Sequence, residues 1–151
     1  MIEDLPEDTE EVQPRSQAMI MLTGLYLFLL VMTVMSYGQP VPFFGRILEG
    51  KAAHIFIGLD SLVCLHLFLG LLKRQRLTWY LLLSYNSYEV LNTLVNLWLV
   101  PRKELERILE RTIDPGGMLF SNLCTVGIVL WISWVIRRQR EQLTNHSPYL
   151  F

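Results

Sequence analysis

Four long stretches without a single Lys or Arg constrain this chain more than any other feature. They occupy residues 18–37, 52–72, 77–100 and 117–136. A helix needs roughly 20 apolar residues to cross a hydrocarbon core of about 30 Å, and each stretch reaches that length. Backbone groups in lipid must be paired within their own segment, which favours helices. The sequence therefore predicts an all-α fold, a four-helix transmembrane bundle in the lipid bilayer.

The connections between the predicted spans differ in character. Residues 38–45 contain two prolines and two glycines and predict a turn-rich connector, and a short helical turn is expected over residues 46–50. Residues 73–76 form a tight basic turn. Residues 102–113 place apolar residues at helical spacing among charges. This segment is too short and too charged to span, so we expect an interfacial amphipathic helix between spans three and four.

The two ends of the chain are polar. Residues 1–16 carry six acids and two prolines, with little apolar surface, which predicts a disordered acidic tail. Residues 141–151 predict a polar C-terminal tail. With four spans, both tails share a side with the basic turn, and that side carries seven Lys and Arg against six on the other. The seven adjoin helix ends directly, so we expect a multi-pass cell-membrane protein with both termini in the cytoplasm.

Composition argues against several classes of function. The formal net charge of -1 provides no basic footprint for nucleic acid. Cys64 and Cys124 fall inside predicted spans without a CxxC partner, and are expected to be small packing residues. His54 and His66 are 12 positions apart on one predicted helix, roughly 18 Å along its axis, which disfavours a shared haem. No catalytic motif or metal-ligand spacing is present. We expect no cofactor, no metal and no enzymatic activity.

Two acids inside the predicted spans are the most informative residues. Asp60 and Glu89 are equally far from the middle of the basic turn, and roughly 1.5 Å per residue places both about 22 Å from it. They should lie at the same depth inside the hydrocarbon. A carboxylate there costs roughly 2.5–3.5 kcal/mol on insertion scales, so such groups face the bundle interior and are paired or protonated. Like charge and burial are expected to keep at least one of them protonated at neutral pH.

Polar neighbours extend this pair into a candidate site. On the third predicted helix Tyr85, Glu89, Asn92 and Asn96 share one face. On the second predicted helix, Ser61 and His54 lie near the side of the helix that carries Asp60. The candidate site comprises Asp60, Glu89, Tyr85, Asn92, Asn96, His54 and Ser61.

Three interpretations of this site are open. The polar residues could join helices as hydrogen-bonded packing, with each bond worth roughly 0.6 kcal/mol. They could bind a proton, a small cation or a polar ligand. They could meet a basic residue of a membrane-protein partner or of a second copy. The first interpretation predicts a structural or accessory subunit of a membrane assembly, and the second predicts a small carrier or ligand-binding protein.

A stretch in the middle of the chain resembles known proteins. The order Gly-Arg-Ile-Leu-Glu-Gly-Lys-Ala-Ala (45–53), a span, Gly-Leu-Leu-Lys-Arg-Gln-Arg-Leu-Thr-Trp (70–79) and a second span is similar to small uncharacterised four-span bacterial inner-membrane proteins. The resemblance covers residues 45–100. It implies a multi-pass bacterial membrane protein and assigns no residue a role.

Overall fold

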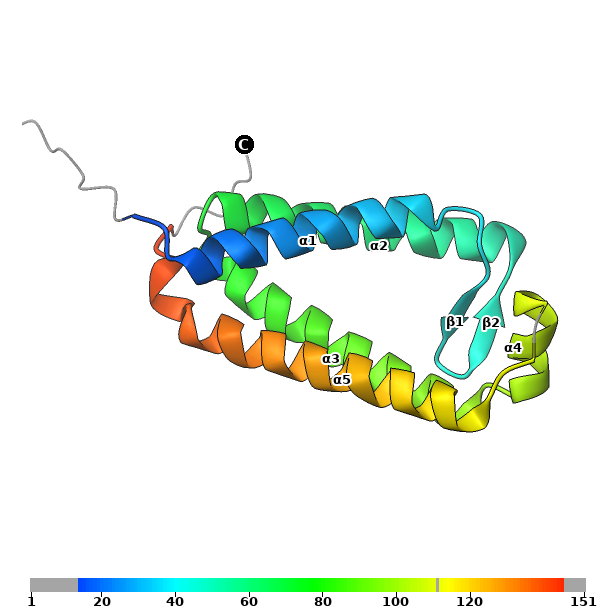
Figure 1. The fold of residues 1–151 in the computed structure, drawn as a ribbon. Helices are drawn as coiled ribbons and strands as arrows, with labels where there is room; N and C mark the ends of the chain where they lie inside the picture. Colours follow the sequence, from blue (N-terminus) through cyan, green and yellow to red (C-terminus); the bar gives the residue numbers. More distant parts are fainter. Residues whose placement is uncertain (1–13, 111, 146–151) are drawn as a thin grey trace, which may run out of the picture.

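The computed structural model describes residues 14–110 and 112–145, and the chain is largely helical, as predicted (Figure 1). The expected tails at residues 1–13 and 146–151 lie outside the described residues. In chain order the elements are α1 (Gln17–Met35), β1 (Val41–Phe43), β2 (Arg46–Leu48), α2 (Gly50–Leu72), α3 (Arg76–Leu99), α4 (Arg102–Leu109), α5 (Pro115–Arg138) and the 3-10 helix η1 (Arg140–Gln142).

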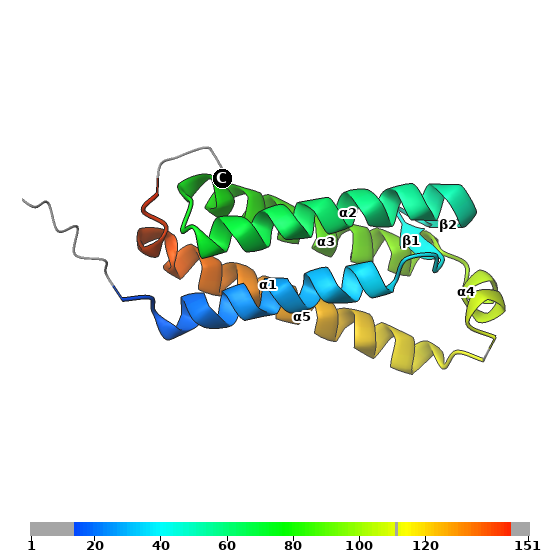
Figure 2. The same ribbon diagram turned by 90° about the horizontal axis from the view of Figure 1, so that it is seen from above.

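The four long helices form two pairs. α1 packs along α2, and α3 packs along α5. The pairs converge at the end where α2 turns into α3, and they diverge toward the other end, where β1 and β2 lie between them (Figure 1). Seen from above, α1 lies over α5 and α2 lies over α3 (Figure 2). Both ends of the described chain lie at the convergent end. The site described below lies where the pairs begin to separate.

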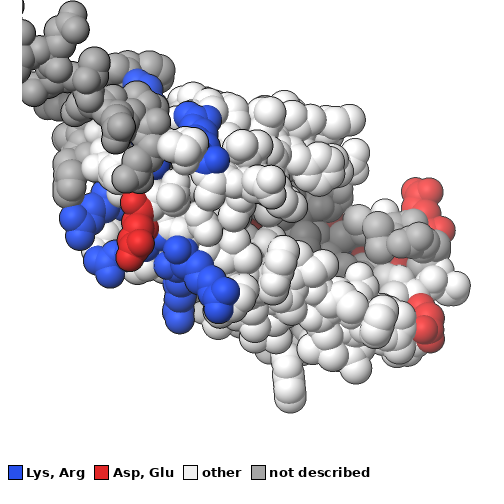
Figure 3. All heavy atoms as spheres, turned by 60° about the vertical axis from the view of Figure 1, so that its left-hand side comes forward, with Lys and Arg blue, Asp and Glu red and all other residues white. Residues whose placement is uncertain are grey.

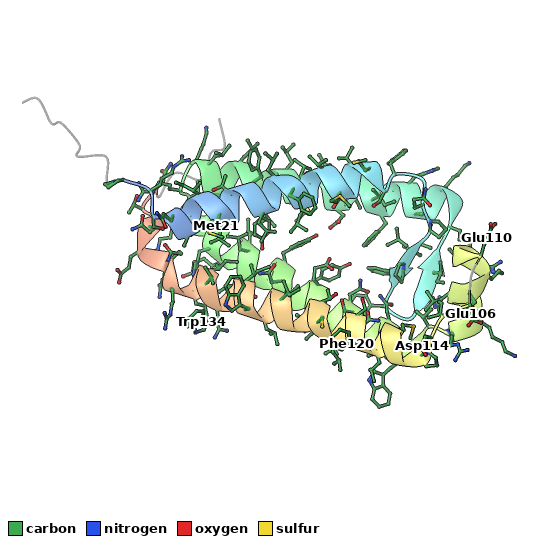
Figure 4. All side chains as sticks on the ribbon, in the orientation of Figure 1. Met21, Glu106, Glu110, Asp114, Phe120 and Trp134 are labelled. Atoms are coloured by element: carbon green, nitrogen blue, oxygen red, sulfur yellow. The ribbon has the colours of Figure 1, made fainter. Side chains whose placement is uncertain are left out.

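Three of the helices, α1, α2 and α5, are long and apolar enough to cross a membrane. Their outward side chains are apolar. Met21 of α1 and Phe120 of α5 are both 70% exposed, and Trp134 of α5 is 48% exposed (Figure 4). A surface with this many exposed large apolar groups is compatible with contact to lipid rather than to water. α3 has the same length as α5 but carries a polar face, which lowers its mean hydropathy.

The apolar core fills the convergent end. It comprises Met19, Leu22 and Tyr26 of α1, Leu67 and Leu71 of α2, Leu82 of α3, Ile132 and Ile136 of α5, and Leu143 beyond η1. Below the turn, Gly70 of α2 lies directly against the Thr78 side chain of α3, so any larger residue at position 70 would collide with it. This close approach brings α2 and α3 together next to the turn.

Polar contacts from distant parts of the chain close the convergent end. Ser16 caps α1 by accepting from the Met19 backbone N–H, and its hydroxyl donates to Gln139 Oε1 at 2.7 Å. The Arg15 guanidinium donates to the last-turn carbonyl of Leu72 at 2.6 Å. The Arg76 N–H donates to the Asn145 carbonyl at 2.9 Å. Residues 143–145, expected in a polar tail, are therefore packed against the turn between α2 and α3.

The segment between α1 and α2 is a β-hairpin, not the helical turn expected over residues 46–50. Val41 pairs with Leu48 and Phe43 with Arg46 in antiparallel register. The loop is the two-residue Phe44–Gly45, and both residues have positive φ, 42° and 82°. This is the geometry of a type I′ turn, which matches the twist of paired strands. The hairpin adds a small sheet to a fold predicted to be all-α.

The helix boundaries also differ in detail from those expected. The predicted interfacial helix over 102–113 is shorter, because α4 ends at Leu109 and Glu110 adopts the left-handed conformation. α5 begins at Pro115, two residues before its predicted start. Asp114 caps it by accepting from the Gly117 N–H at 2.6 Å, and Pro115 occupies the first turn. Proline suits that position because its missing N–H would have no helical partner.

Candidate functional site

A cavity of about 380 Å³ lies between the two helix pairs, and all four long helices line it. α2 contributes Asp60, and α3 contributes Tyr85 and Glu89. The remaining wall is mostly apolar, and it comes from Leu25, Tyr26, Leu29 and Thr33 of α1, from Asn86 and Thr93 of α3, and from Thr125, Ile128, Val129 and Ile132 of α5. The two acids predicted to lie at one depth therefore face the same space between the helix pairs.

Tyr85 of α3 forms the hydrogen bond that links α3 to the acid of α2. Its hydroxyl donates to Asp60 Oδ1 at 3.0 Å and lies 3.5 Å from the Cys64 sulfur. The Glu89 carboxyl, one helical turn beyond Tyr85, lies close to that hydroxyl and to Asp60. Asp60 and Glu89 are both half-buried. The tyrosine thus occupies one oxygen of Asp60, and Glu89 faces the cavity.

A second polar chain crosses the bundle beside the cavity. The Tyr26 hydroxyl of α1 donates to Asn86 Oδ1 at 2.8 Å, and Asn86 Nδ2 donates to the Ser133 hydroxyl of α5 at 3.1 Å. Tyr26 and Asn86 are buried, so this chain satisfies polar atoms that lipid could not. It ties α1 and α5 to α3 on the convergent side of the cavity. Sequence reasoning missed Tyr26, Asn86 and Ser133, because they belong to three different helices and meet only across the bundle.

Asn92 and Asn96 have a different role from the acids. Asn92 Oδ1 accepts from the Phe44 N–H at 2.9 Å, and Asn96 Oδ1 accepts from the Gly45 N–H at 2.7 Å. Asn96 Nδ2 donates to the Pro42 carbonyl at 3.1 Å. These two asparagines hold the hairpin loop against α3, next to the divergent end of the cavity. They satisfy backbone groups that the two short strands leave unpaired.

The other two predicted site residues lie apart from the cavity. His54 stacks on the ring of Tyr37 with centroids 4.8 Å apart, at the divergent end. The Ser61 hydroxyl donates to the Ile57 carbonyl of its own helix at 2.7 Å. The structure thus brings Asp60, Tyr85 and Glu89 together, assigns the asparagines to the hairpin, and places His54 and Ser61 elsewhere.

The chemistry available in the cavity is that of carboxyl and hydroxyl oxygens. Two carboxyls and one phenol can hold and exchange a proton, or coordinate a small cation or a protonated amine. Among residues 14–110 and 112–145 there is no cluster of three or more His, Cys, Asp or Glu arranged to hold a metal ion. The apolar part of the wall lowers the local polarity, which strengthens the electrostatic attraction between the acids and a cation.

Comparison with known proteins adds no assignment to this geometry. No protein-family profile, curated protein or solved structure matches the chain.

Proposed function

We propose that α3 is a fourth membrane crossing, so that the chain is a four-span protein. Its 24 residues extend roughly 36 Å at about 1.5 Å per residue, enough for a bilayer core. Its polar residues Asn86 and Asn92 are buried, whereas Leu91 and Trp98 are exposed on its outer side. Both ends of the described chain lie at one end of the bundle (Figure 1), and this arrangement requires an even number of crossings.

Cysteine labelling from one side of the membrane tests the number of crossings. In a C64S/C124S background, single cysteines replace Lys73, Lys103 and Thr144 and are probed in cells with a membrane-impermeant maleimide. Four crossings place positions 73 and 144 on one side and position 103 on the other. Labelling of 73 and 103 from the same side would show that α3 does not cross. Protection of positions 73 and 144 in intact cells, with labelling after lysis, would further place both termini in the cytoplasm.

For the function, the geometry best supports a non-enzymatic carrier or binding protein that takes a proton or small cation between Asp60 and Glu89. One observation carries this proposal: the two carboxyls come from different helices yet face one cavity in an apolar wall. The same cavity is also lined by Tyr26 and Asn86, which join α1, α3 and α5 through hydrogen bonds. The space beside Glu89 is large enough for a small ligand.

Infrared spectroscopy of the carboxyl groups tests this role directly. We expect the purified protein in nanodiscs to show a protonated carboxyl at neutral pH, and we expect this signal to change when small cations or amines are added. The signal should be lost or altered in D60N or E89Q. The matched control is E104Q, which removes an acid from α4 outside the cavity. Two ionised carboxyls that respond to no cation would contradict the proposal.

The second candidate, an accessory subunit, is favoured by the seam between α1 and α5. The cavity reaches the outer surface at Thr125 and Ile128, and Ile128 is 58% exposed. A helix from a partner or a second copy could cover this seam and direct a basic residue at the acids. Native mass spectrometry from mild detergent separates the candidates. A stoichiometric protein partner that is lost in T125W would favour the accessory subunit. A monomer whose cation binding is lost in E89Q but kept in T125W would favour the binding protein.

A further inference from the structure

Positive charge is concentrated at the convergent end of the bundle. Seven Lys and Arg residues and one acid, Glu141, lie there among the described residues, whereas the divergent end has five of each sign. Figure 3 shows the basic side chains gathered at this end, with an uncharged surface beyond them. The seven are Arg15, Lys73, Arg74, Arg76, Arg137, Arg138 and Arg140.

Two of these cations line a pocket. Arg76, in the first turn of α3, and Arg140, in η1, border a cavity of about 440 Å³ with Glu141, Leu143 and Thr144. Both arginines are exposed. Their guanidiniums can donate in parallel to the oxygens of one phosphate, a geometry that arginine makes better than lysine.

Aromatic side chains hold the basic groups at the edge of the apolar surface. The Arg140 guanidinium lies over the Trp79 ring at 5.0 Å, and the Arg138 guanidinium lies over Trp134 at 3.8 Å. Tyr80, which packs edge-on against Trp79, is 50% exposed on the first turns of α3. Trp and Tyr favour the headgroup level of a bilayer. The pocket therefore opens where lipid phosphates lie.

We propose that this pocket binds the headgroup of an anionic phospholipid, with Arg76 and Arg140 on the phosphate. The inference is independent of the cation site between Asp60 and Glu89. A membrane lipid fits better than a soluble phosphate, because exposed Leu77, next to Arg76, offers an apolar path for the acyl chains. The Glu141 carboxylate favours a headgroup that can donate from a hydroxyl, so phosphatidylglycerol is the appropriate probe.

A lipid competition experiment on the full-length protein tests the proposal. The protein in mild detergent is incubated with equal amounts of phosphatidylglycerol and phosphatidylcholine of matched chains, and native mass spectrometry measures the bound ratio. We expect wild-type protein to retain phosphatidylglycerol preferentially. R76Q/R140Q should lower that ratio roughly fivefold for each cation removed. Added salt should also lower the ratio in wild type, because the contact is electrostatic.

Two further variants separate pocket binding from general attraction and from misfolding. K51Q/K103Q removes two exposed cations from the divergent end and should leave the ratio unchanged. R76K/R140K retains the charge without the paired donors and should give an intermediate ratio. An unchanged ratio in R76Q/R140Q, or an equal loss in K51Q/K103Q, would overturn the proposal. Displacement of the lipid by millimolar inorganic phosphate would assign the pocket to a soluble anion instead.

Discussion

At the scale of single residues, Tyr85 is the contact on which the cavity depends. Its hydroxyl reaches Asp60 across the two central helices, at a point where α2 and α3 have begun to separate. Hydrogen bonds between membrane helices contribute modestly, about 0.6 kcal/mol on average and up to about 1.7 kcal/mol. Removing this one would also leave an Asp60 oxygen without its donor inside an apolar wall.

We therefore expect Y85F to lower stability by about 1–2 kcal/mol, measured as resistance to denaturation by SDS in mixed micelles. Y80F is the matched control, since Tyr80 is half exposed and keeps its ring contact with Trp79. Equal effects of the two substitutions would show that the Tyr85–Asp60 bond does not hold the helices.

Gly45 supports a second prediction at this scale. Its φ is 82°, and a Cβ at this position would lie 2.5 Å from the Leu99 Cβ. G45A should therefore strain the loop and push α3 away, at a cost of roughly 1–3 kcal/mol. G24A is the control, because an added Cβ there meets nothing within 4 Å. The same SDS titration measures both. A G45A protein as stable as G24A would mean that the loop does not pack against α3.

Sequence reasoning identified the acids but not what surrounds them. Counting from the basic turn was enough to place Asp60 and Glu89 at one depth, because an antiparallel helical hairpin has a fixed rise per residue. Helical spacing also placed Asn92 and Asn96 on the face of Glu89. It could not show that their amides bind the hairpin loop, since that contact joins residues about fifty positions apart. Whether the acids bind a ligand stays a prediction.

At the scale of elements, the hairpin is a short non-helical segment in a largely helical chain. Backbone outside helices is tolerated in a membrane domain only where protein groups or water satisfy it. Here the asparagines of α3 do so for the loop. The sequence pattern did not predict this element, because each strand has only three residues and one of them contains Pro42. Alternating patterns need longer runs than this to be recognised.

Loss of the asparagine contacts should loosen the hairpin without unfolding the helices. In N96A the Gly45 N–H and the Pro42 carbonyl lose their partner. We expect faster hydrogen exchange over residues 41–48, with little change in α1 or α5. N122A is the matched control, because Asn122 donates only within its own helix, to the Met118 carbonyl. Unchanged exchange at the hairpin in N96A would show that another contact retains it.

The segment between α4 and α5 is held to α4 by one carboxylate at the surface, that of Glu106. Glu106 accepts from the Arg102 guanidinium at 3.0 Å and from the Ile113 N–H at 3.1 Å. These contacts favour its charged form, and the Ile113 N–H contributes most, so the pKa of Glu106 lies below its usual range. A lowered pKa means that the contacts stabilise the fold above the unfolded pKa. They are lost as the pH falls through the folded pKa.

The lowered pKa of Glu106 predicts how this contact responds to acid. The Ile113 amide resonance, followed by NMR, should keep its neutral-pH position until the pH falls below the usual range of Glu, and should then shift. R102Q should move the midpoint upward, and E106Q should abolish the transition. K103Q should change the midpoint less than R102Q. Lys103 is a neighbouring cation, and its effect on Glu106 is smaller than that of Arg102. A midpoint at the ordinary Glu value in wild type would contradict this assignment.

At the scale of the whole molecule, the bundle is tight at one end and open toward the other. The core and the polar contacts with the 143–145 segment lie at the convergent end. The hairpin lies where the pairs separate (Figure 1), and the cavity lies between the pairs. Stability is therefore expected to depend mainly on the convergent end, and ligand access on the opening at Thr125 and Ile128.

Leu143 tests this division of the molecule. It is 4% exposed and belongs to the main core although it follows the last long helix. L143A should cost about 2–5 kcal/mol, as expected for truncation of a buried leucine. L130A, at a 55% exposed position on the outer side of α5, should be close to neutral in lipid. Thermal unfolding in nanodiscs compares the two. Equal melting temperatures would show that residues beyond η1 do not support the bundle.

The contact between Asn145 and the turn has a consequence for biosynthesis. The Asn145 amide donates to the Lys73 carbonyl, although the two residues are 72 positions apart. The ribosome therefore makes α2 and α3 well before it makes the segment that completes their turn. Until then the turn lacks the hydrogen bonds that Asn145 makes with it. A nonsense mutation just after α5 would spare every long helix and yet remove the segment that completes this turn.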